Sequence, residues 1–173
     1  MFKDISKFNK ISDYLPFFNA SILADIIIIL MLYYTNAFNS SYLKKWYESY
    51  RLSAVIADVF ILVIGKIIVR SIYYKFFSEF SIFKFLILIV IVQIIHDILF
   101  YIFFKSVPRN INNMLDLFKD YANEVSYGAV LGDSFMIIMS TLFSSLFANL
   151  DINKNIILNI FLVYLIPYVI YIR

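Results

Sequence analysis

Long apolar stretches separated by short polar connections dominate the sequence. About 20 consecutive apolar residues form a helix long enough to cross the hydrocarbon core of a bilayer. Four stretches reach this length and a fifth comes close to it, which predicts an all-α membrane bundle of four to five transmembrane helices. The predicted spans cover residues 17–36, 52–74, 83–104, 127–149 and 156–172. The fifth is short and contains Asn159 and Pro167, so it either spans with little tilt or lies partly in the interface.

Two further segments are amphipathic. In residues 1–16, apolar side chains fall on one helical face and lysines elsewhere, which predicts an interfacial helix that ends at Pro16, ahead of a bundle over residues 17–173. Residues 113–125 show the same division, with Asn113 as a candidate cap and Asp116 in the first turn, and predict a surface helix. The connection over residues 37–51 is rich in aromatic residues beside Lys44 and Lys45, a composition typical of headgroup depth.

Composition supports the membrane interpretation and removes several kinds of chemistry. Hydrophobic residues make up 62% of the 173 residues and charged residues 16%, against about 45–50% and about 25% in soluble domains. The chain has no Cys and a single His, so sites that need thiolates or several imidazoles lack ligands. The basic residues are scattered, which argues against a nucleic-acid partner. We therefore expect the lipid bilayer as the environment, with no cofactor and no metal.

Each of the first four predicted spans contains an aspartate, and a carboxylate near the bilayer centre costs about 2.5–3.5 kcal/mol on insertion scales. These side chains should therefore turn away from lipid. Counting residues along helices of alternating direction places three of them at one depth. On the third span, Gln93 and His96 share a face with one of these aspartates. The predicted intramembrane polar cluster consists of Asp58, Gln93, His96, Asp97 and Asp133. Asp25 falls near the depth of Lys66, and we expect these two to form an ion pair.

Two interpretations of the cluster stay open. A histidine among carboxylates at one depth is the kind of arrangement that relays protons or coordinates a cation. Alternatively, the same groups only join helices through satisfied hydrogen bonds. Small residues spaced four apart also predict close helix packing along one ridge of the fourth span, at Gly128, Gly132, Ser140 and Ser144.

Motifs for catalysis are incomplete. The stretch Leu131-Gly132-Asp133 is similar to part of the Gly-x-Gly-Asp motif of intramembrane aspartyl proteases, but position 130 is Val and the other aspartates lack the family's Tyr-Asp context. A serine hydrolase would need Ser134 with His96 as its base, and only the residue types support that pairing. We therefore expect no catalytic activity.

The stretch from His96 to Ile137 resembles small multi-span membrane proteins of nucleocytoplasmic large DNA viruses, the giant viruses. The resemblance is carried by His96-Asp97, Val107-Pro108-Arg109-Asn110, Leu117-Phe118-Lys119-Asp120-Tyr121-Ala122, Glu124 and Ala129-Val130-Leu131-Gly132-Asp133-Ser134. It implies a multi-pass protein of the viral internal membrane or of host endomembranes. The leading hypothesis is a structural or assembly role, with further copies of the chain or other membrane or capsid proteins as partners. The alternative is a small proton or cation transporter or channel that uses the intramembrane Asp and His residues.

Overall fold

The computed structural model describes residues 1–35 and 40–172, and every regular element in this part of the chain is helical. The prediction of an all-α bundle is therefore confirmed. After a 3-10 turn at Ile11–Asp13, the helices are α1 (Tyr14–Tyr34), α2 (Ser41–Tyr50), α3 (Leu52–Phe76), α4 (Ile82–Ser106), α5 (Asn113–Val125), α6 (Gly128–Phe147) and α7 (Ile152–Val169). Residues 36–39 and 173, which the predicted first span, first connection and bundle include, lie outside the described residues.

Five of these helices are long and apolar enough to cross a membrane: α1 with the turn before it, α3, α4, α6 and α7. The chain is thus a multi-pass membrane protein. The fifth candidate begins at Ile152, earlier than predicted, because the Asp151 side chain accepts a hydrogen bond from the Lys154 backbone N–H and caps the helix. Helix α5 has the predicted bounds, although Asn112 rather than Asn113 provides the cap.

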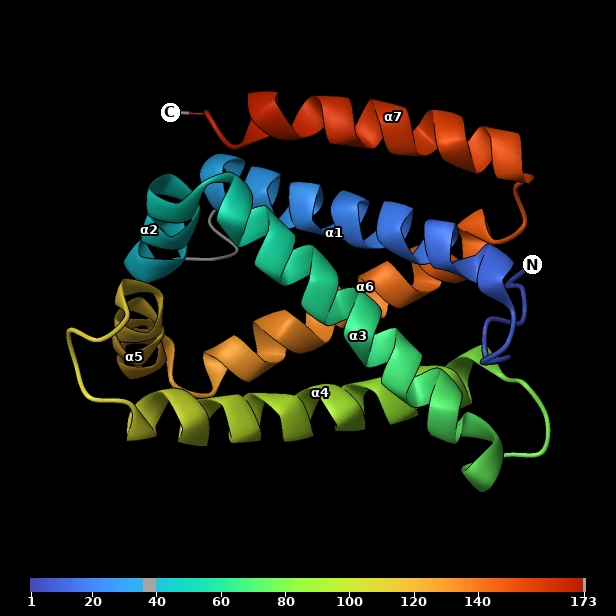
Figure 1. Ribbon diagram of the computed structural model, residues 1–173, viewed down its shortest axis with the longest axis horizontal. Coiled ribbons are helices and arrows are strands. Elements are labelled where there is room, and N and C mark those ends of the chain that lie inside the picture. The colour runs from blue at the N-terminus through green and yellow to red at the C-terminus, as the bar shows by residue number, and fades with distance from the viewer. Residues whose placement is uncertain (36–39, 173) are drawn as a thin grey trace.

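Helix α1 lies in the middle of the bundle (Figure 1) and packs against α6, α7 and α3, while α4 packs against α6 and α3. Helices α4 and α7 lie on opposite outer sides, and their outward faces carry many exposed apolar side chains. An apolar outer surface is what contact with acyl chains requires. The two short helices α2 and α5 pack against each other at one end of the bundle.

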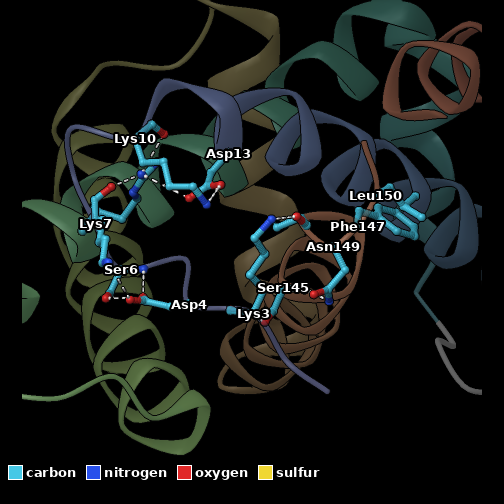
Figure 2. A network of polar contacts seen from close by, with 12 residues as sticks. Lys3, Asp4, Ser6, Lys7, Lys10, Asp13, Ser145, Phe147, Asn149 and Leu150 are labelled. Atoms are coloured by element: carbon cyan, nitrogen blue, oxygen red, sulfur yellow. Dashed lines mark hydrogen bonds and ion pairs between the residues drawn. The ribbon is translucent and has the colours of Figure 1, made fainter. Parts of the chain in front are cut away.

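The predicted amphipathic helix over residues 1–16 is wrong in most of its length. Residues 1–10 contain no helix, and they run along the other end of the bundle (Figure 2). There the backbone N–H of Lys3 donates to the Ser145 carbonyl, and its ammonium group donates to the Ala148 carbonyl. The first carbonyl lies in the last turn of α6 and the second belongs to its C-cap residue, where helical partners are missing. Satisfying these groups, and burying Ile5 completely, favours the extended path over a surface helix.

The same segment covers the buried guanidinium of Arg70. Its Nη2 donates to the carbonyls of Lys7 and Lys10 and lies 3.5 Å from the Asp13 carboxylate. The ring of Phe17 lies 5.1 Å from the same guanidinium. The chain therefore supplies its own polar partners to this cation, which does not need to reach the headgroups.

Candidate functional site

A cavity of about 650 Å³ lies toward the α2–α5 end of the bundle, between α3, α4 and α6. Helices α2 and α5, which lie at this end of the bundle (Figure 1), supply further lining residues. All five residues of the predicted polar cluster line it: Asp58 from α3, Gln93, His96 and Asp97 from α4, and Asp133 from α6. Side chains from three separate spans thus meet in one cavity, which also has a large apolar wall.

On α4 the polar residues bond mainly to each other. The Gln93 amide donates to Asp97 Oδ1 over 2.6 Å, and His96 Nδ1 lies 3.3 Å from the same oxygen. The partner of His96 is therefore the next residue of its own helix and not an aspartate of a neighbouring helix. His96 is partly exposed and stacks on Phe100. The second oxygen of Asp97 is buried and has no partner within the described chain.

Asp133 makes no hydrogen bond to any described residue, although it lines the cavity. Tyr121 of α5 faces the same space. Burial, followed by the charges of Asp133, Asp58, Glu124 and Asp97, raises the pKa of the Tyr121 phenol. Three of these carboxylates, Asp58, Asp97 and Asp133, line the same cavity as Tyr121.

Tyr47 of α2 joins two spans. Its hydroxyl lies 2.7 Å from Asp25 Oδ1 on α1 and 3.0 Å from Asp58 Oδ2 on α3, and Trp46 Nε1 donates to the same Asp58 oxygen over 3.0 Å. Burial, and then the two carboxylates, raise the pKa of the Tyr47 phenol, so it remains a donor at neutral pH. A phenol has one proton and can fully donate it to only one carboxylate. Both contacts are full hydrogen bonds only when one of the two carboxyl groups is itself protonated.

This bridge was not predicted, because residues 37–51 were interpreted as an aromatic-rich connection and not as a helix. A signal was present: Leu43, Trp46, Tyr47 and Tyr50 follow i, i+3, i+4, i+7 spacing, which is typical of an amphipathic helix. Trp46 and Tyr47 are buried in the structure. The pattern would have predicted the helix, although not which spans its aromatic face contacts.

The expected ion pair between Asp25 and Lys66 is wrong. Lys66 Nζ donates to Ser21 Oγ over 2.9 Å and to Ser140 Oγ, and it lies 5.5 Å from the Phe17 ring centroid. Ser21 stands one turn before Asp25, so the ammonium group meets α1 one turn from the predicted position. Asp25 belongs instead to the α2 end of the bundle, where Tyr47 is its partner.

The predicted small-residue ridge of α6 divides into two parts. Ser140 and Ser144 are fully buried, and Ser140 Oγ lies 3.2 Å from Ser21 Oγ of α1, so this half packs closely against another helix. Gly128 and Gly132 line the cavity instead. A Cβ atom at Gly128 would meet Val125 at 3.7 Å, which is an ordinary contact. The two glycines therefore line the cavity, whereas Ser140 and Ser144 belong to the half of α6 that packs against α1.

Glu124 fastens the two short helices together. Its carboxylate accepts hydrogen bonds from the hydroxyls of Ser40 and Ser41 and from the backbone N–H groups of Ser41 and Tyr42, at the start of α2. Partial burial opposes its ionisation, but these hydrogen bonds outweigh that effect and lower the pKa of Glu124 to about 2. A carboxylate at a helix N-terminus also interacts favourably with the helix dipole.

No protein-family model matches the chain, and no curated protein or solved structure matches it either. What the fold and the cavity establish is a multi-pass helical membrane protein whose intramembrane acids gather at one end of the bundle.

Proposed function

We propose that the protein is a small proton-linked membrane transporter or channel. One observation carries the proposal: carboxylates from three spans line a single cavity within the bundle. Ionisable residues at membrane depth that face a cavity are typical of proton and ion pathways. A merely adhesive role for these residues would have favoured a dry, fully paired core, and Asp133 has no partner at all among the described residues.

The hydrogen bonds indicate how protons enter the scheme. The Asp25–Tyr47–Asp58 chain needs one proton beyond that of the phenol to complete both of its bonds. Elsewhere in the cavity lining, His96 Nδ1 lies 3.3 Å from Asp97 Oδ1, and Asp133 lines the same cavity from α6. Within the described residues no three acidic or histidine side chains come close enough to hold a metal ion. Proton exchange needs no such cluster, so protons are the species that we assign.

The test is proton flux into liposomes that contain the purified protein and a trapped pH-sensitive dye. We expect wild-type flux above that of protein-free vesicles, and a loss of most of that excess in Asp97→Asn and Asp133→Asn. Asp151→Asn is the matched control, because Asp151 is exposed at the start of α7 and asparagine can also cap a helix. A folded wild-type protein without excess flux, or equal flux in all four proteins, would refute the proposal.

A structural or assembly role is the second candidate, and the fastening of α2 favours it. Tyr47, Trp46 and Glu124 all hold this short helix in place, as would suit a rigid surface presented to other membrane or capsid proteins. The resemblance to giant-virus proteins adds the viral membrane as the proposed location, with no catalytic activity. Cross-linking in the native membrane tests it: a specific cross-link from α2 or α5 to a partner supports this role, and its absence together with proton flux rejects it.

A further inference from the structure

The cavity has a one-sided charge. Three carboxylates line it, and none of the described residues that line it is a lysine or arginine. The charge is also incompletely matched by hydrogen-bond donors. Asp133 has no donor in the described chain, and Asp97 Oδ2 is buried without one. A ligand that brings positive charge and N–H or C–H donors would satisfy these groups, whereas an anion would meet only repulsion.

Part of the remaining wall is aromatic. The Phe118 ring lies in the centre of a cluster, with centroids 4.8 Å from Trp46, 5.2 Å from Phe100 and 6.3 Å from Phe104. Tyr121 lines the cavity beside them. Aromatic faces attract organic cations, most strongly where water is excluded, and they offer little to a small hydrated metal ion. A volume of about 650 Å³ is also in the range of cavities that hold small organic molecules.

From these features we infer that the cavity binds a hydrophobic organic monocation, such as an alkyl- or aryl-substituted ammonium compound. The charged centre lies between Asp97 and Asp133, and the apolar part packs against the cluster around Phe118. This inference deepens the proposed function by naming the class of solute, and it rests on that proposal for the idea that the solute is transported. The binding itself depends only on the cavity.

Trp46 provides a direct probe, because it is the only tryptophan of the chain and it lines the cavity. Tetraphenylphosphonium and tetraphenylborate have nearly the same size and shape and opposite charge. We expect tetraphenylphosphonium to change the Trp46 fluorescence of the detergent-purified protein saturably, and tetraphenylborate to give no saturable change. Asp133→Asn should weaken the cation's affinity by about tenfold or more. Phe118→Leu should weaken it severalfold, and Asp151→Asn should leave it unchanged.

Asp133→Asn is informative because the side chain has no hydrogen bond to lose within residues 1–35 and 40–172. Far-ultraviolet circular dichroism checks that the variant is folded. Equal affinity of wild type and folded Asp133→Asn for the cation, or saturable binding of the anion, would overturn the inference. Proton flux that persists in that case would leave the proposed function intact. Charge-selective binding that depends on Asp133, in a protein without proton flux, would instead support the ligand class and reject proton transport.

Discussion

Removing the Tyr47 hydroxyl should destabilise the protein by an amount that the structure allows us to estimate. In Tyr47→Phe, Asp25 loses its hydrogen bond of 2.7 Å and retains no partner among the described residues, while Asp58 keeps the bond from Trp46. A hydrogen bond to a charged group contributes about 1.5–3 kcal/mol, and a buried acceptor left without a donor incurs its desolvation cost. The ring remains, so no large cavity forms. We expect a loss of about 2–3 kcal/mol in the free energy of unfolding.

For a chain of this size, such a loss lowers the melting temperature by about 4–12 °C. Thermal unfolding in detergent, followed by Trp46 fluorescence, measures it close to the site. Tyr50→Phe is the matched control, because Tyr50 lies on the same helix and its hydroxyl makes no hydrogen bond in the described chain. Equal melting temperatures of the two variants would refute the reasoning that Tyr47 is the main partner of Asp25.

Three further predictions concern substitutions of single residues. Glu124→Gln should speed up hydrogen exchange in α2, because the free energy that protects its backbone amides should fall by about 0.5–1 kcal/mol after solvent screening. In the wild type, this protection should be full above the ordinary Glu pKa of 4.5 and should fade as the pH falls toward about 2. Lys66→Met should keep or raise the melting temperature, since Ser21 and Ser140 can still bond to each other over 3.2 Å, whereas loss of a buried ion pair would cost about 3–5 kcal/mol. Ser126→Gly should stabilise the protein by about 1 kcal/mol in thermal unfolding, because Ser126 adopts φ 50°, a conformation that glycine adopts with less strain.

Each of these three predictions has a result that would contradict it. Unchanged hydrogen exchange of α2 in Glu124→Gln would show that the Glu124 carboxylate does not stabilise α2. A large loss of stability in Lys66→Met would show that the Lys66 ammonium group has a buried counter-charge after all. A lower melting temperature in Ser126→Gly would show that the serine contributes more than its backbone strain costs.

The amino-acid sequence predicted the spans well, because a spanning helix must meet two local conditions, length and hydropathy. It also predicted α5, whose polar and apolar faces are distinct. The path of residues 1–10 could not be read in this way, since it depends on the carbonyl groups that the end of α6 leaves unpaired. Helical periodicity was compatible with that segment but did not determine its structure.

The depth of the polar residues in the bundle could be predicted from the sequence, but their hydrogen-bond partners could not. Counting residues along the spans placed Asp58, Asp97 and Asp133 close together, and the structure has all three around one cavity. The count could not give the rotation of each helix about its axis or the fold of the first connection. The helix rotations and the fold of the first connection determine that Asp25 bonds to Tyr47 and that Lys66 bonds to serines. Pairings between helices therefore required the tertiary structure.

The central claim, that the cavity acids carry exchangeable protons, is most directly tested by infrared difference spectroscopy of the protein in bilayers. The carbonyl stretching band of protonated carboxyl groups would be followed in a titration from about pH 5 to about pH 9. Asp151 adds no signal there, because its hydrogen bonds with Lys154 lower its pKa and keep it ionised. We predict a band that disappears as the pH rises and that is smaller in Asp133→Asn. A wild-type protein with no titrating band, or with a band that Asp133→Asn leaves unchanged, would contradict the account.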